Sequence, residues 1–393
     1  MKSMTKELLL LHLTLIDGIG PITIKKIWSN IPDDFEVLDL YRFKVLDVAH
    51  MFGLSERVAS KIVSGLQNTD KLEKEIHLIS KHNIQFVTIA CEAYPQLLAN
   101  IYAPPPVLYF TGENILGYEK KVAFVGSRKA HRYGEKAIEN IIPDMVKNGF
   151  VIVSGGAIGA DSMAHSTTVR SGGKTVAVIG SGLLHPYPHS NRRLFDQIID
   201  SGGALVSPFP LDTVAKPGNF PARNRIIAGL SIGCVVVQAA KKSGASITAQ
   251  FALDQGREVF AIPGPVDDEL SLGCHALIQQ GAKLISDAQD ILVEFGHVTQ
   301  SCEVVKQISG KAVAKNMSIT DVKQNLKISV KHSNSYEDGT IEYLIMEYCK
   351  KPCSIDEISI ATDKKINELH EILFEMQLQG NIQQNHAGMF ERL

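Results

Sequence analysis

The sequence predicts an α/β fold with a parallel β-sheet at its centre. Residues 121–295 alternate between short apolar runs rich in β-branched residues and longer stretches with helical periodicity. The runs are continuous in their apolar character, which is typical of strands buried on both faces. They comprise residues 122–125, 150–154, 175–179, 204–207, 234–238, 259–262 and 283–285. Helical crossovers between parallel strands are right-handed, so the pattern predicts a doubly wound, Rossmann-like domain.

The composition is that of a globular protein with several domains. Of the 393 residues, 45% are hydrophobic and 21% are charged, which excludes disorder as the main state. No apolar run reaches the roughly 18 residues of a membrane span, so we expect no membrane partner. The 6 cysteines are scattered, without the spacing of a disulfide framework or a zinc site. We therefore expect a cytoplasmic protein without a metal.

Residues 1–90 predict a small helical domain. A Gly-x-Gly turn at residues 16–21 leads into a helical run, and residues 52–55 form a weaker copy. This is the hairpin of a helix-hairpin-helix or SAM-like unit, whose bare N–H groups can approach a phosphate. A plain turn between packed helices is an equal alternative, and a balance of 11 basic and 11 acidic residues argues against strong DNA binding here. A helix at 71–82 and a strand at 84–90 complete the domain.

The remaining boundaries follow from composition. A proline-rich segment at residues 94–109 leads into the Rossmann-like domain, which we place at 91–298. Residues 299–333 predict a flexible basic linker. Residues 334–393 predict a winged-helix domain, with helices at 341–348, 354–358 and 367–379 followed by two strands. Its 11 acidic residues outnumber 5 basic ones, so a protein-interaction module is favoured over a DNA reader.

Glycines, hydroxyls and basic side chains follow the predicted strands. Because the carboxyl ends of parallel strands meet at one edge of a sheet, these residues should share a rim. Glycine loops expose N–H groups, arginines bind phosphates with two hydrogen bonds, and aromatic rings stack on bases. The rim therefore predicts binding of a run of phosphates. The candidate DNA contacts are Gly126, Ser127, Arg128, Arg192, Lys216, Phe220, Arg223, Asn224, Arg225 and Lys241.

An enzymatic alternative uses Asp161 and His165. These residues lie at i and i+4, so a helix would place them on one face as an acid–base pair of a nucleotide or nucleoside hydrolase. The number of basic residues along the rim favours a nucleic-acid strand over one mononucleotide. A helix cap is the simpler role for Asp161. No dinucleotide fingerprint follows the first strand of the sheet, so we expect no cofactor.

Several motifs together resemble one family, the DNA-processing protein A family, also called DprA or Smf. They are VGSR at 125–128, SGGAIGAD at 154–161, FPARNRIIAGLS at 220–231, SGASITAQFAL at 243–253 and GCHALIQQGAKLI at 273–285. The helical first domain and the winged-helix end also fit, so the resemblance covers nearly the whole chain. The chain departs from the family pattern at Gln238, where glutamate is usual, and at His189, where lysine is expected.

The resemblance implies a non-enzymatic recombination mediator. Such a protein binds single-stranded DNA without sequence preference and protects incoming strands during natural transformation. It also loads the RecA recombinase onto strands coated with single-strand-binding protein. Arg128 would clamp a phosphate and Phe220 would stack on a base. The resemblance also implies a homodimer whose surface overlaps the recombinase contact, with plain core packing as an equal alternative. That surface comprises Leu253, His275, Ile278, Gln279 and Leu284.

Overall fold

The computed structural model describes residues 5–295, apart from 33, 34 and 242, and part of residues 340–392. The chain divides into two compact units, Met1–Cys302 and Glu303–Leu393. The linker predicted at 299–333 lies outside the described residues. No helix within the described ranges combines the length and the apolar character that crossing a membrane needs.

A nine-stranded sheet forms the centre of the first unit, in the order β1-β2-β6-β5-β4-β3-β7-β8-β9. Strands β3 to β9 pair in parallel, and β1 and β2 add an antiparallel edge. All seven runs predicted as strands of the central domain belong to it. The strands are β1 Gln85–Thr88, β2 Val107–Gly112, β3 Lys121–Val125, β4 Val151–Ser154, β5 Thr175–Val178, β6 Ala204–Ser207, β7 Gly233–Val236, β8 Glu258–Ala261 and β9 Lys283–Leu284.

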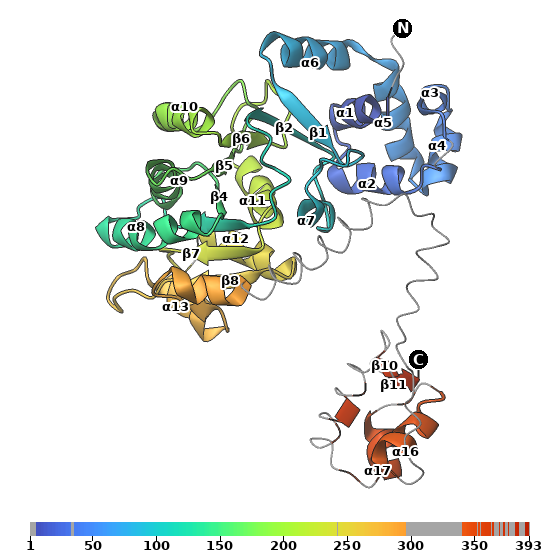
Figure 1. The fold of residues 1–393 in the computed structure, drawn as a ribbon. Coiled ribbons are helices and arrows are strands. Elements are labelled where there is room, and N and C mark those ends of the chain that lie inside the picture. Colours follow the sequence, from blue (N-terminus) through green and yellow to red (C-terminus); the bar gives the residue numbers. More distant parts are fainter. Residues whose placement is uncertain are drawn as a thin grey trace, which may run out of the picture. The chain divides into compact units, whose positions relative to one another are not determined.

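Helices cover both faces of the sheet (Figure 1). Along β3, Val122 and Phe124 pack in the core under α8, whereas Ala123 and Val125 pack in the core under α11 and α12. This alternation follows from the two-residue period of a strand. The helices are α7 Gln96–Ala99, α8 Arg132–Lys147, α9 Ala160–Arg170, α10 Arg192–Asp200, α11 Asn219–Gly229, α12 Gly244–Asp254 and α13 Leu272–Gln279, with a 3₁₀ turn at His189–Asn191.

The N-terminal helices have a hydrophobic core of their own and also pack against the central domain. Leu11 and Leu72 share a buried cluster with Leu183 and Leu211 of the central domain, and β1 pairs with β2. The strand predicted at 84–90 as part of the first domain pairs with the central sheet as β1. The helices are α1 Lys6–Thr14, α2 Pro21–Ser29, α3 Val37–Leu40, α4 Val45–Phe52, α5 Glu56–Gln67 and α6 Asp70–Lys81.

The second unit has a small core of its own. It contains α16 Ile341–Tyr348, α17 Ile355–Thr362 and the antiparallel pair β10 Ile382–Gln384 and β11 Phe390–Arg392. The helix predicted at 367–379 lies mostly outside the described residues. The buried side chains of this core include Ile345, Ile358, Leu369, Met376 and Phe390.

Candidate nucleic-acid interface

A cleft of about 450 Å³ opens where β3 and β7 end, the point at which the strand order reverses. Such switch points are the usual ligand sites of doubly wound sheets. Its lining includes six of the predicted contacts, which are Gly126, Ser127, Arg128, Phe220, Arg223 and Asn224. A smaller pocket of about 40 Å³ adjoins it and is also lined by Ile158, Tyr187 and Pro188. Both cavities share Arg128 and Phe220, which therefore stand between them.

The Phe220 ring lies close to Arg128, Tyr187 and Gly180. The guanidinium carbon of Arg128 lies 5.4 Å from the centre of the Phe220 ring, and the Tyr187 ring centre lies 5.8 Å from it. Gly180 lies against the ring, since a Cβ there would come within 2.9 Å of it. No ion pair among the described residues uses Arg128, so its charge is available to a phosphate. The arrangement fits a stacked base beside a phosphate.

Backbone contacts fix the loop that carries Arg128. The Ser127 N–H donates to the Gln238 carbonyl at 2.6 Å, and the Ala160 N–H donates to the Ser127 carbonyl at 3.1 Å. Gly159 has a φ of +85°, and a Cβ there would collide with the Ser127 carbonyl. Only glycine therefore lets the start of α9 approach the Arg128 loop so closely.

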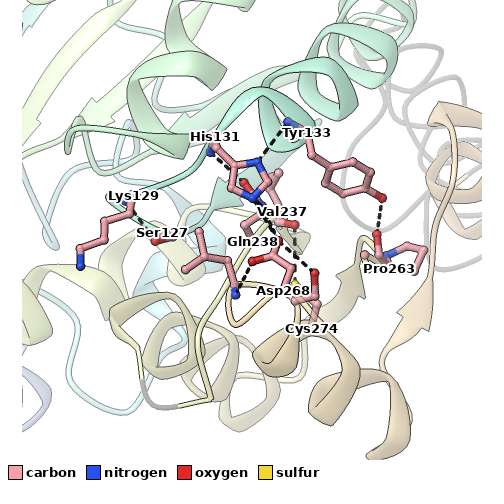
Figure 2. Close-up of polar contacts among 12 residues, drawn as sticks. Ser127, Lys129, His131, Tyr133, Val237, Gln238, Pro263, Asp268 and Cys274 are labelled. Carbon is pink, nitrogen blue, oxygen red and sulfur yellow. Dashed lines mark hydrogen bonds and ion pairs between the residues drawn. The ribbon is translucent and has the colours of Figure 1, made fainter. Parts of the chain in front are cut away.

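Gln238 connects this loop to the segment before α13 (Figure 2). Its side-chain oxygen accepts the His131 N–H at 3.1 Å, and its side-chain nitrogen lies 3.3 Å from Asp268 Oδ2. The Nε2 atom of His131 lies 3.0 Å from the same carboxylate oxygen. A neutral amide can accept and donate here, whereas a glutamate would place a second carboxylate against Asp268. This network accounts for a glutamine at position 238, and no local sequence pattern predicts it.

Arg223 is buried below the cleft, with 4% of its surface exposed. Its guanidinium donates to the carbonyls of Gly155 and Val178, at the ends of β4 and β5. Asp161 accepts the N–H groups of Gly155 at 3.1 Å and Ala157 at 3.3 Å. Burial lowers the pKa of Arg223 to about 10, so it stays charged at neutral pH beside the buried Asp161. Arg223 therefore supports the loops of the cleft and does not present its charge to solvent, unlike the contact predicted for it.

The Arg225 side chain lies near Tyr94, away from Arg223. A helix turns by about 100° per residue, so Arg223 and Arg225 on α11 point roughly 200° apart. The Arg225 charge acts on Tyr94, and its buried Nε atom has no hydrogen-bond partner. It lines neither of the two cavities described above, so its predicted DNA contact stays a prediction.

The other predicted contacts lie around the cleft. Asn224 accepts from Arg223 Nε at 3.1 Å and donates to the Gly244 carbonyl at 3.3 Å, so it ties α11 to α12. Arg192, Lys216 and Lys241 are exposed but line neither cavity. They lie at the start of α10, before α11 and between β7 and α12.

Asp161 and His165 do not form an acid–base pair. No described contact joins them. The Asp161 carboxylate accepts hydrogen bonds from the Gly155 and Ala157 N–H groups of its own loop, and it interacts with the Ser154 side chain. His165 is fully buried, and its Nδ1 lies 2.7 Å from Thr175 Oγ1. Because Thr175 donates its hydroxyl proton to Ile152, His165 is the donor and carries its proton on Nδ1. Burial lowers the pKa of His165 to about 3.

The residues predicted for a dimer surface lie on α12, α13 and β9. Leu253 and Leu284 are 47% and 48% exposed, and Gln279 is also exposed. Ile278 packs partly against the main core, and His275 Nε2 lies 3.0 Å from the Gly264 carbonyl oxygen. The two leucines are thus the accessible apolar part of this surface.

Metal ligands do not gather in the described part of the chain, where no group of three or more His, Cys, Asp or Glu side chains surrounds a common point. Cys349 and Cys353 have sulfur atoms 3.5 Å apart without such a group around them.

Comparison with known proteins identifies the family. The sequence model of the family described as DNA recombination-mediator protein A matches residues 85–296. Protein Smf of Synechocystis sp. is 32% identical over 391 residues, covering 96% of both chains. DNA processing protein DprA of Streptococcus pneumoniae is 47% identical over 208 residues, covering 53% of this chain and 73% of the relative.

A solved structure agrees with these matches. The X-ray structure of DNA processing protein A from Streptococcus pneumoniae is similar with a TM-score of 0.65 and 36% identity, covering 74% of this chain and 98% of that chain. The resemblance inferred from the motifs is therefore confirmed. The chain belongs to the DNA recombination-mediator protein A family, whose role lies in DNA processing and recombination.

Proposed function

We propose that this protein binds single-stranded DNA at the cleft, without reading its bases and without catalysing a reaction. The observation that carries the proposal is the pair formed by Arg128 and Phe220, which lies between two cavities at the rim of the sheet. A guanidinium over an aromatic ring offers a phosphate contact and a stacking surface together, and neither depends on base identity. Asp161 and His165 make their hydrogen bonds to other groups, to the Ala157 N–H and to Thr175, which favours this role over hydrolysis.

Beyond strand binding, we propose a cytoplasmic homodimer that protects incoming strands in natural transformation and loads RecA onto them. Family membership supports this, as do the exposed Leu253 and Leu284. The direct test is the ATP hydrolysis of RecA on strands coated with single-strand-binding protein, with and without this protein. An increase with it is expected, and no increase would contradict the loading role.

For the second unit, we propose a winged-helix arrangement that binds a protein partner. The antiparallel pair β10 and β11 fits the wing, and the acidic balance of residues 333–393 disfavours a phosphate backbone. A chain truncated after residue 295 should therefore keep its affinity for single strands at fixed salt. Loss of most of that affinity would instead make this unit a DNA reader.

Arg128→Ala is expected to weaken binding of an oligo(dT) strand by roughly 10- to 100-fold, since it removes a charge-assisted contact. The slope of the logarithm of affinity against the logarithm of salt concentration should also become shallower by about one.

Phe220→Ala should weaken the free energy of strand binding by about 1–3 kcal/mol through lost stacking. Gel shifts or fluorescence anisotropy at several salt concentrations measure both effects.

Matched variants separate local contacts from net charge and from packing. Arg57→Ala removes an exposed arginine from α5 in the N-terminal helices and should leave affinity nearly unchanged. Phe220→Tyr keeps an aromatic ring and should retain most of the binding. Equal losses in Arg128→Ala and Arg57→Ala would contradict the assignment of the cleft. Turnover of a nucleotide that disappears in Asp161→Ala would favour the hydrolase.

Leu284→Arg is expected to produce a folded monomer, because it places a charge on an exposed apolar residue of the edge strand β9. Leu46→Arg is the control, since Leu46 is 57% exposed and lies on α4 among the N-terminal helices. Sizing chromatography with light scattering measures the mass of each variant. A Leu284→Arg protein that stays dimeric would reject this surface.

A further inference from the structure

The loop of residues 208–218 immediately precedes α11, which carries Phe220. It packs against the loop that carries Tyr187. The Gly182 N–H donates to the Thr213 carbonyl at 2.7 Å, and the Leu184 N–H donates to the Leu211 carbonyl at 3.1 Å. A Cβ on Gly182 would collide with the Leu211 carbonyl, so the two loops touch along their backbones. Anything that fixes the 208–218 loop therefore also fixes both aromatic residues of the cleft.

A buried carboxylate of the N-terminal helices holds this loop from its other side. Glu75 on α6 is 4% exposed, and its Oε1 accepts the Leu211 N–H at 2.8 Å across 136 positions of sequence. Leu211 itself is fully buried and packs in one cluster with Leu11 and Leu72 from the same helices. A buried carboxylate is unfavourable unless it is hydrogen-bonded, so this contact accounts for a glutamate at this position.

An exposed chain of charges runs beside the buried contact. Lys74 Nζ lies 2.8 Å from Asp212 Oδ2, and Asp212 Oδ1 lies 2.9 Å from His185 Nε2. Lys74 precedes Glu75, Asp212 follows Leu211, and His185 precedes the segment with Tyr187. The N-terminal helices thus contact the 208–218 loop through one buried side chain, Glu75, and one exposed side chain, Lys74. Asp212 of that loop in turn contacts His185, which precedes Tyr187 in the other loop.

We propose that Glu75 is a positioning residue for strand binding: through Leu211 it fixes the 208–218 loop, and so makes the geometry of Phe220 depend on the N-terminal helices. This inference rests on the proposed function. It gives those helices a part in DNA binding without any contact of their own with DNA. Loss of the contact should free the loop while leaving the parallel sheet intact, because the sheet residues are held by their own ladders.

The test is Glu75→Ala in the full chain, with Glu73→Ala as the matched control. Both remove one acid from α6, but Glu73 is exposed, so effects of net charge on DNA binding are equal in the two variants. We expect hydrogen exchange of residues 208–220 to rise roughly tenfold in Glu75→Ala only, since a buried N–H loses its acceptor. Affinity for oligo(dT) at fixed salt should fall several-fold in that variant only. Glu75→Gln retains the accepting oxygen and should restore both properties.

Glu75→Asp provides the test if Glu75→Ala does not fold, because it keeps the charge and withdraws the carboxylate by one methylene. Faster exchange of residues 208–220, together with weaker binding of oligo(dT) than in Glu73→Ala, supports the inference in either folded variant. Faster exchange with affinity equal to that of Glu73→Ala overturns it. Unchanged exchange there, with affinity equal to that of Glu73→Ala, overturns it. A wild-type chain that binds no single strand would refute the proposed function alone, because the exchange measurement still decides whether Glu75 holds the loop.

Discussion

Arg223→Ala is expected to lower the free energy of unfolding by about 3–5 kcal/mol, the effect of removing one partner from a buried pair of charges. The variant leaves the Gly155 and Val178 carbonyls without their donor, and it leaves Asp161 buried without the nearby positive charge. Because these groups shape the cleft beside Arg128, affinity for single strands should fall as well, although Arg223 itself is buried. Urea unfolding followed by circular dichroism measures the free energy of unfolding. Fluorescence anisotropy at low urea measures the affinity for single strands.

Two further variants identify the cause. Arg193→Ala removes an exposed arginine from the start of α10 and should change stability by less than about 0.5 kcal/mol. Arg223→Lys keeps the charge but loses the planar fork that reaches two carbonyls, so its stability should lie between those of Arg223→Ala and the wild type. An Arg223→Ala protein as stable as Arg193→Ala would show that the buried guanidinium contributes nothing to the fold.

The central sheet was predictable because its signal is local. Most of the parallel strands are short apolar runs between polar turns, as at residues 122–125 and 175–179, and are buried on both faces. The edge strand β9 differs, since Leu284 is 48% exposed. The strand order follows from right-handed crossovers, which leave few topologies open. The pairing of the edge strand β1 with β2 could not be predicted in the same way, because it depends on contacts between segments that no local pattern encodes.

The candidate site was predictable only in part. Arg128 and Phe220 were found because glycines and aromatic residues after strands mark a rim, and the structure brings the two together. Arg223 and Arg225 are predicted as contacts from their charge and from the family resemblance. Their helical spacing already indicates that they cannot share a face. Glu75 and Gln238 carried no motif, since their partners lie 136 and 107 residues away in sequence.

Acid should destabilise this protein through His165 in particular. Burial lowers its pKa from 6.5 to about 3, so the folded chain keeps the imidazole neutral while the unfolded chain protonates it below about pH 6.5. A lowered pKa in the folded state means that its stabilisation is present above pH 6.5 and is lost as the pH falls toward 3. At pH 4.5, two units below the unfolded pKa, the loss attributable to this residue should be about 3 kcal/mol.

His165→Asn isolates this contribution, because the amide can still donate to Thr175 Oγ1 but does not titrate. Urea unfolding gives the free energy of unfolding of the wild type and of the variant at pH 7.5 and at pH 4.5. The difference between the two proteins is then compared at the two pH values, so that the contributions of all other titrating groups cancel. The variant will be less stable at pH 7.5 through imperfect packing, and we expect that deficit to shrink by about 3 kcal/mol at pH 4.5. His77→Asn, at an exposed position of α6, should show no such change. If the stability deficit of the variant is the same at both pH values, His165 is protonated at pH 4.5 in the folded protein as it is in the unfolded chain. Its burial then does not keep it neutral.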